Sequence, residues 1–183
     1  VLNGRIVTGK DIYLQCERHV NDLKQQKKKS FSYYFDEEAA EQVIKFAAVS
    51  FFGKGRLSGK HFELAGWQAA CLWQVYGWKR KDTHTRKYKQ VYVKVARKNG
   101  KTEFLGLIGN YGYTNEAFKG PEKDPEIYWA ATKKDQAKYG WLIQKSQLKH
   151  LCGYSPKVGN YCKILTHNID TVKGTGFVRY LGK

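Results

Sequence analysis

The chain has 183 residues, of which 42% are hydrophobic, which is enough for one core and excludes a wholly disordered protein. Its 33 lysines and arginines outnumber 16 acidic residues, and the net charge of +17 favours a polyanionic partner, meaning nucleic acid, a nucleotide or an anionic membrane surface. No apolar run approaches the ~20 residues that span a bilayer, and the first residues lack the apolar core of a signal peptide, so no membrane segment is predicted.

The four cysteines are scattered along the chain and form no C-x-x-C pair or His-containing group with metal-ligand spacing. They are Cys16, Cys71, Cys152 and Cys162. This pattern favours reduced structural thiols in a cytoplasmic protein over a zinc or disulfide site. The chain also contains no methionine, so we expect it to be a piece of a longer protein.

Helical periodicity dominates the first half of the chain. A helix is predicted over residues 11–26, with Asp11 as its N-cap. The predicted apolar face of this helix consists of Ile12, Cys16, His19, Val20 and Leu23. A second helix is predicted after Asp36, which is its expected N-cap, and a buried helix over residues 64–77. Residues 78–89 are then expected to form a basic connector.

The second half alternates between strand and helix patterns. A strand is predicted at residues 90–95 and a helix after Gly100, because apolar residues first alternate and then recur at helical spacing. A second strand at residues 126–132, a helix from Lys133 to His150 and further strands follow. Those further strands are expected at residues 161–167 and 176–182. The order indicates an α/β fold with a mainly parallel sheet.

Gly100, Lys101 and Thr102 stand between the predicted strand and helix, as they would in a phosphate-binding loop. Such a loop aims backbone N–H groups and a helix N-terminus at phosphates, while its lysine and hydroxyl contact phosphate oxygens and Mg²⁺. The glycine that usually begins the motif is replaced by Val95. An ordinary surface turn is the alternative, but the flanking elements favour a phosphate site.

Five stretches in the same order resemble the large terminase subunit of tailed bacteriophages, the ATPase that drives DNA into an empty capsid. They are "NGRIVTGKDIYLQCERHVNDL", "FSYYFDEEAAEQVIKF", "GRLSGKHFELAGWQAACLWQVYGW", "VARKNGKT" and "YWAATKKDQA". The resemblance covers most of the chain, and the loop form without its first glycine is that of the family. It implies a P-loop NTPase core over residues 64–183, preceded by an N-terminal helical segment and linker at residues 1–63.

The resemblance also implies roles for individual residues around ATP and Mg²⁺. Gln68 would contact adenine, although a polar residue in a core helix is the alternative. Thr102 would bind Mg²⁺ through its hydroxyl, and Lys101 would bind the β- and γ-phosphates. Arg97 would act on the γ-phosphate, with a solvated cation as the alternative. The remaining loop residues expected at the nucleotide are Lys98, Asn99 and Gly100.

At the level of function, the resemblance implies a motor that couples ATP hydrolysis to translocation of double-stranded DNA into a procapsid. The parent protein would also be an endonuclease. It would act as a homo-oligomeric ring with the small terminase subunit and the portal protein, in the cytoplasm of a bacterial host, encoded by a phage or prophage. ATPases need carboxylates for Mg²⁺ and water. Asp170 is a weak candidate, so we expect the chain to be truncated before the acidic Walker B strand and to turn over ATP poorly.

The basic surplus fits contacts to DNA phosphates, although solvated loops explain the same residues. The candidates are Lys79, Arg80, Lys81, Arg86 and Lys87, with Lys27, Lys28 and Lys29 earlier in the chain. Two other functions remain open from the sequence. One is a P-loop nucleic-acid translocase of helicase type, and the other is a non-enzymatic basic DNA-binding module in which Asn-Gly-Lys-Thr is only a turn.

Overall fold

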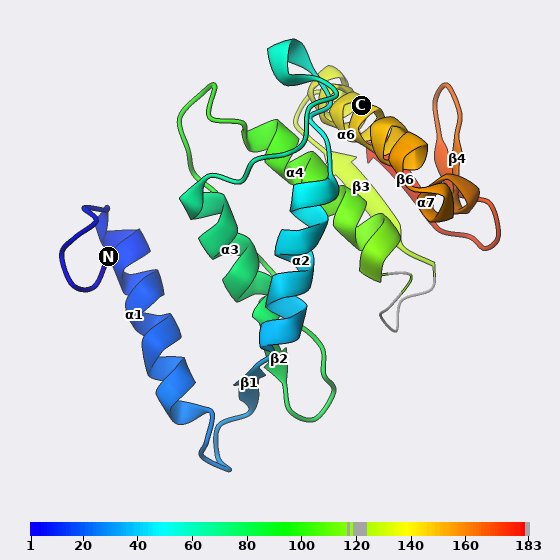
Figure 1. The fold of residues 1–183 in the computed structure, drawn as a ribbon. Helices are drawn as coiled ribbons and strands as arrows, with labels where there is room; N and C mark the ends of the chain where they lie inside the picture. Colours follow the sequence, from blue (N-terminus) through cyan, green and yellow to red (C-terminus); the bar gives the residue numbers. More distant parts are fainter. Residues whose placement is uncertain (117, 119–123, 182–183) are drawn as a thin grey trace. The chain divides into compact units, whose positions relative to one another are not determined.

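The computed structural model describes residues 1–116, 118 and 124–181. Contacts divide the chain into two compact units that interleave along the sequence (Figure 1). The first unit contains residues 1–44 and 66–92, and the second contains residues 45–65 and 93–183. The predicted boundary between residues 63 and 64 stays a prediction.

The first unit is mainly helical and carries one small pair of strands. Its elements are α1 (Lys10–Gln25), β1 (Tyr33–Phe35), the first part of α2 (Glu37–Val49), α3 (Gly66–Gly77) and β2 (Trp78–Arg80). The three predicted helices are thus confirmed. The antiparallel pairing of β1 with β2, which places Tyr33 opposite Arg80, was not predicted. Three-residue strands are too short to show an alternating pattern.

The two predicted N-caps have different outcomes. Asp36 is confirmed, because its Oδ1 accepts a 2.9 Å hydrogen bond from the backbone N–H of Ala39. Asp11 is wrong: α1 begins at Lys10 with Gly9 at the N-cap position, and no side chain caps it. Asp11 instead lies inside the first turn, where its negative charge favours the positive end of the helix dipole.

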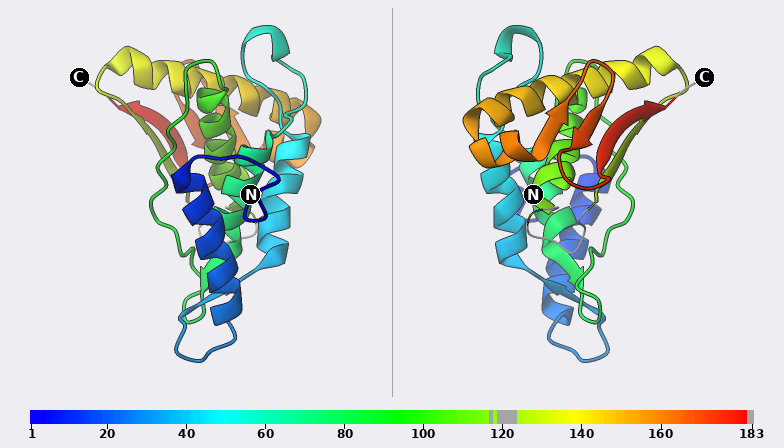
Figure 2. Two further views of the ribbon diagram at one scale, coloured as in Figure 1. Left: turned by 90° about the vertical axis from the view of Figure 1, so that its left-hand side faces the viewer. Right: turned by 90° about the vertical axis from the view of Figure 1, so that its right-hand side faces the viewer.

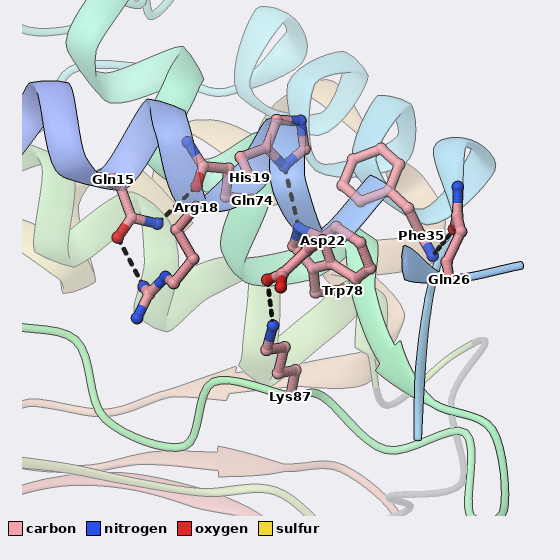
Figure 3. A network of polar contacts seen from close by, with 9 residues as sticks. All are labelled: Gln15, Arg18, His19, Asp22, Gln26, Phe35, Gln74, Trp78 and Lys87. Carbon is pink, nitrogen blue, oxygen red and sulfur yellow. Dashed lines mark hydrogen bonds and ion pairs between the residues drawn. The ribbon is translucent and has the colours of Figure 1, made fainter. Parts of the chain in front are cut away.

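Helix α1 is attached to its unit through polar side chains, one of which, His19, belongs to the predicted apolar face; the other members of that face are half-buried or exposed. Ile12 is 50% exposed, and the buried residue of α1 is Asp22. Asp22 forms an ion pair with Lys87, and the indole N–H of the fully buried Trp78 donates a 2.9 Å hydrogen bond to Nδ1 of His19 (Figure 3). Such contacts hold one geometry because each buried polar group needs its own partner.

The ammonium group of Lys87 is also surrounded by aromatic rings of the same unit. Phe31, Tyr33, Trp78 and Tyr88 have their ring centroids 4.8–5.5 Å from its nitrogen. The ring faces carry partial negative charge and therefore add to the attraction of Asp22. Lys87 is accordingly part of the core of the first unit, with 14% of its side chain exposed.

The second unit has a four-stranded sheet in the order β3-β6-β5-β4 and several helices. Its helical elements include η1 (Gly55–Leu57), α4 (Lys101–Asn110), the π-helix η2 (Tyr111–Glu116), α6 (Lys134–Tyr154) and α7 (Pro156–Tyr161). Its strands are β3 (Glu126–Ala130), β4 (Cys162–Ile164), β5 (Ile169–Thr171) and β6 (Phe177–Leu181). The strands predicted at residues 126–132, 161–167 and 176–182 are confirmed with shorter bounds, and β5 was not predicted.

The predicted mainly parallel sheet is wrong, because the sheet is mixed. Only β3 and β6 run parallel among its described pairings, with Glu126 opposite Phe177. β5 is antiparallel to both β4 and β6. The chain between these three strands is only a few residues long, and such short links can join antiparallel strands alone. The parallel pair, by contrast, is connected through α6.

The strand predicted at residues 90–95 is not formed. The chain there is extended but unpaired, and Val91 and Tyr92 are 50% and 89% exposed. Alternating valines favour an extended backbone, but a strand also needs a neighbour for its N–H and C=O groups. Residues 91–95 have no strand partner within the described part of the chain.

Helix α6 joins the sheet to α4 within the second unit (Figure 2). Towards the sheet, Trp129 donates its indole N–H to the side-chain oxygen of Gln144, and Trp141 donates to the carbonyl of Val178 at 3.3 Å. Towards α4, the side-chain oxygen of Gln147 would lie 2.6 Å from a Cβ at Gly106, so a side chain there would require Gln147 to move. In the described residues, no helix combines the length and the hydropathy required to cross a bilayer.

Candidate functional site

The loop before α4 turns sharply at two residues with positive φ. Lys98 has a φ of 66° and Gly100, the N-cap residue of α4, has a φ of 67° and a ψ of 13°. Glycine adopts this left-handed conformation without the steric penalty of a side chain. The side-chain amide of Asn99 donates a 3.3 Å hydrogen bond to the carbonyl of Ala96 and thereby closes the loop on itself.

The start of α4 presents unpaired backbone donors. Its first intrahelical bond runs from the N–H of Phe104 to the carbonyl of Gly100, at 2.9 Å. The N–H groups of Lys101, Thr102 and Glu103 therefore precede the hydrogen-bonded ladder of the helix. Together with the positive end of the helix dipole, such donors favour an anion.

A pocket of about 530 Å³ opens beside this helix start, entirely within the second unit. The lining residues are Lys54, Gly55, Ala96, Arg97, Lys98, Gly100, Lys101, Thr102, Glu103, Tyr139 and Ile143. They come from the start of η1 and the residue before it, from the loop and first turn of α4, and from α6. Four of the side chains are cationic and one is anionic, so the pocket favours a negatively charged ligand.

The fold brings most of the predicted loop residues together in this pocket. Arg97, Lys98, Gly100, Lys101 and Thr102 all line it. The remaining loop residue is turned back to the loop backbone through its amide, as described above. Gathering at one pocket is a necessary condition for the predicted nucleotide contacts, whose chemical roles stay predictions.

Gln68 is in α3 and therefore belongs to the first unit, whereas the loop residues belong to the second. Its side chain is buried, with 5% of the residue exposed. A buried amide must be hydrogen-bonded, which fits both a core residue and a residue that contacts a ligand. The predicted adenine contact of Gln68 therefore stays a prediction.

The cations of the loop are exposed and uncompensated. Across residues 1–116, 118 and 124–181, no ion pair or hydrogen bond engages the side chain of Arg97, Lys98 or Lys101. The acidic side chain nearest to them in sequence is that of Glu103, whose oxygens accept the backbone N–H groups of Gly53 and Lys54. This charge distribution suits a polyphosphate better than a singly charged anion.

The side chains of the pocket supply little for a metal ion alone. The described part of the chain holds no group of three or more His, Cys, Asp or Glu side chains that could bind a metal. Thr102 contributes one hydroxyl, and Mg²⁺ is commonly bound through substrate phosphates, water and few protein oxygens. The residues present therefore fit Mg²⁺ that is carried by a nucleotide. Asp170, the weak candidate for an acidic ligand, is paired with Arg179.

Six lining residues were missed by the sequence analysis. They are Lys54, Gly55, Ala96, Glu103, Tyr139 and Ile143. Tyr139 and Ile143 lie four residues apart on α6 and therefore on one helix face, a spacing that the sequence does show. Lys54 stands between two glycines, a pattern that is typical of a loop but does not show a position beside α4. Only the fold brings segments some fifty residues apart to one pocket.

Most of the predicted DNA-contacting cations in the connector have partners inside the first unit. Lys79 pairs with Asp36 at 2.8 Å, Arg80 pairs with Asp82 at 2.7 Å, and Lys87 pairs with Asp22. Lys81 donates hydrogen bonds to the carbonyls of Gln26 and Lys28, and Arg86 lies over the ring of Tyr76. The three lysines at positions 27–29 are exposed, and they are therefore the better candidates.

Comparison with known proteins gives one family and one related structure. The family model described as "Terminase large subunit, ATPase domain" matches residues 66–179. The crystal structure of the HK97 bacteriophage large terminase aligns with a TM-score of 0.53 and 20% sequence identity, over 78% of this chain and 27% of the HK97 chain. At this identity the likeness concerns the fold, and this chain spans about a quarter of the length of the HK97 protein. No curated protein matches the chain.

Proposed function

Because the chain belongs to the terminase large subunit ATPase family, we propose that it forms the ATP-binding part of a DNA-packaging motor. The observation that carries the proposal is the pocket beside α4, where Arg97, Lys98 and Lys101 meet the exposed N–H groups of a helix start. Backbone donors and unpaired cations that line one pocket suit the charge of a triphosphate. Membership of the family supports ATP as the ligand of that pocket and DNA packaging as the purpose of its hydrolysis.

Each loop residue has a distinct part in this proposal. Lys101 neutralises the β- and γ-phosphates, and Thr102 binds Mg²⁺ through its hydroxyl. The backbone of Lys98, Asn99 and Gly100 wraps the phosphate chain. Arg97 approaches the γ-phosphate and stabilises the charge that develops during its transfer. Mg²⁺ supplies further neutralisation of the same charge.

Gln68 is proposed to recognise adenine, since an amide both donates to and accepts from the edge of the base. In the whole protein, hydrolysis would drive double-stranded DNA into a procapsid, with the small terminase subunit and the portal protein as partners. A homo-oligomeric ring, a DNA endonuclease activity, and a bacterial host cytoplasm as the place of action belong to the same proposal. Hydrolysis further requires carboxylates to hold Mg²⁺ and activate water.

Thermal unfolding with and without Mg²⁺-ATP tests the proposal on this chain. A ligand at one hundred times its dissociation constant stabilises the folded state by ~2.7 kcal/mol. We expect a shift of that order in the parent and none in Lys101→Ala. Lys60→Ala is the matched control, because Lys60 lies in the second unit but does not line the pocket. A parent without any response to ATP would instead support the non-enzymatic DNA-binding module.

A further inference from the structure

The segment before η1 is fastened to the first turn of α4 by one carboxylate. Oε2 of Glu103 accepts the backbone N–H of Gly53 at 2.9 Å, and Oε1 accepts that of Lys54 at 3.0 Å. Gln147 of α6 donates to the same carboxylate at 2.6 Å and to the backbone carbonyl of Glu103 at 3.0 Å. Hydrogen bonds to an ionised acceptor are among the stronger ones, so this clamp holds the segment firmly.

Helix α6 fixes the same segment from a second side. A Cβ at Gly53 would lie 2.5 Å from the backbone carbonyl oxygen of Ile143 and 3.0 Å from the side chain of Gln147. Backbone atoms cannot yield as a flexible side chain does, so only glycine permits this close approach. Gly53 is buried, whereas its neighbour Lys54 is exposed. The fold thus presents Lys54 at a defined place.

Lys54 is presented at the pocket beside the start of α4 that was described above. Lys54 lines it together with Arg97, Lys98 and Lys101. The ammonium nitrogen of Lys54 lies 4.4 Å from the ring centroid of Tyr139, another lining residue. A cation–π contact at an exposed site is weak and can be exchanged for a phosphate oxygen.

The charge balance of the pocket supports a ligand-binding role for this lysine. Glu103 is the one acidic side chain among the described lining residues, and both of its oxygens are occupied by N–H donors. Within the described residues Lys54 forms no ion pair. Bringing a fourth cation to three others costs electrostatic free energy, which an anionic ligand in the pocket would offset.

We propose that Lys54 is a further phosphate-binding residue of this pocket and that Glu103 is the residue that positions it. The inference rests on the proposed function, since it takes the pocket as the site of a nucleoside triphosphate. Lys54 contacts the phosphate chain from a segment outside the phosphate loop. The flexible stem of a lysine allows its ammonium group to move from the Tyr139 ring to a phosphate oxygen.

Calorimetric titration of this chain with Mg²⁺-ATP and with inorganic tripolyphosphate tests the role of Lys54. Tripolyphosphate isolates the phosphate contacts from those of the base. We expect Lys54→Ala to weaken both ligands on the order of tenfold, as when one charge-assisted hydrogen bond is removed. The Lys60→Ala control should bind like the parent, and Lys54→Arg should recover most of the affinity.

The outcomes separate this inference from the proposed function. If the parent binds, Lys101→Ala does not, and Lys54→Ala stays within twofold of the parent, then the role of Lys54 is overturned while the nucleotide site stands. If the parent binds neither ligand, both fail. Weakened ATP binding with unchanged tripolyphosphate binding would also overturn the inference, because it would assign Lys54 to the base or sugar.

A double-mutant cycle tests the positioning role of Glu103. Glu103→Gln keeps the size of the side chain but replaces one acceptor by a donor, which releases the segment around Lys54. In that background, adding Lys54→Ala should change affinity less than twofold, although it costs on the order of tenfold in the parent. A merely structural role of Glu103 would leave the effect of Lys54→Ala unchanged in the variant, and that result would overturn the positioning role.

Discussion

In the first unit, Lys87 is paired with the buried Asp22 and enclosed by aromatic rings, whereas Lys101 in the second unit lies exposed at a helix start. The charge of the first lysine is compensated within its own unit, so loss of its partner would leave a buried charge without compensation. The second has no ion pair within the described residues and is available to a ligand. Both lysines contribute one positive charge each to the net charge of +17. Net charge alone therefore does not show which cations bind a partner.

The largest expected effect on stability comes from removing the partner of the buried lysine, Lys87. Asp22→Asn should lower the free energy of unfolding by about 3 kcal/mol, because it leaves the Lys87 ammonium largely buried without its counter-charge. Chemical denaturation monitored by tryptophan fluorescence would measure the decrease. Equal stability of the parent and this variant would contradict the assignment of Lys87 to the core.

Two controls sharpen that result. Asp82→Asn removes the partner of Arg80 in an exposed pair and should leave the stability unchanged within error. Adding Lys87→Met to Asp22→Asn removes the uncompensated charge and should restore much of the stability. If the double variant stayed as unstable as the single one, poorer packing rather than charge would explain the effect.

A smaller effect is expected at the exposed lysines of residues 27–29 when the chain binds double-stranded DNA. Replacing all three by alanine should reduce the slope of log K against log salt concentration, by roughly 0.9 for each DNA phosphate that a lysine no longer neutralises. Replacing Lys81, whose ammonium group is bonded to two backbone carbonyls, should change the slope less. Fluorescence anisotropy over a range of salt concentrations would measure both. Identical slopes for the parent and the triple variant would place the DNA contacts elsewhere.

The smallest effect concerns pH and the hydrogen bond between Trp78 and His19. Burial lowers the pKa of His19 below its usual value; the Asp22 charge opposes this shift and the Lys87 charge adds to it. Nδ1 must also stay unprotonated to accept the indole N–H. The unfolded chain, with a histidine pKa of about 6.5, therefore binds the proton more readily. This contribution to stability is present above that pH and is lost as the pH falls below it.

Comparison with His19→Gln isolates this contribution, because glutamine can still accept the indole N–H but does not titrate. Unfolding free energies at pH 7.5 and pH 5.5 should differ more in the parent than in the variant. The same pH dependence in both proteins would show that other groups account for it.

The sequence by itself determined the main helices, the strands β3, β4 and β6, and the turn at Gly100 that precedes α4. The features that predict them are local properties of the sequence. They are the helical periodicity, the cap formed by Asp36, and the spacing of Gly100, Lys101 and Thr102. Each depends on interactions between residues that are close together in the chain. The resemblance to the terminase family was likewise present in short ordered stretches, and the family match over residues 66–179 confirms it.

Only the tertiary structure decided which elements pair and which charges stay available. The valines at residues 91–95 alternate as a strand would, yet no described strand pairs with them, and the short β3–β6 pairing depends on a crossover through α6. Lys87 and Lys101 look alike in the sequence, but one lies in a core and the other lines a pocket. Strand pairing, burial and ion pairing join residues far apart along the chain, so their free energies are set by the fold rather than by neighbouring residues.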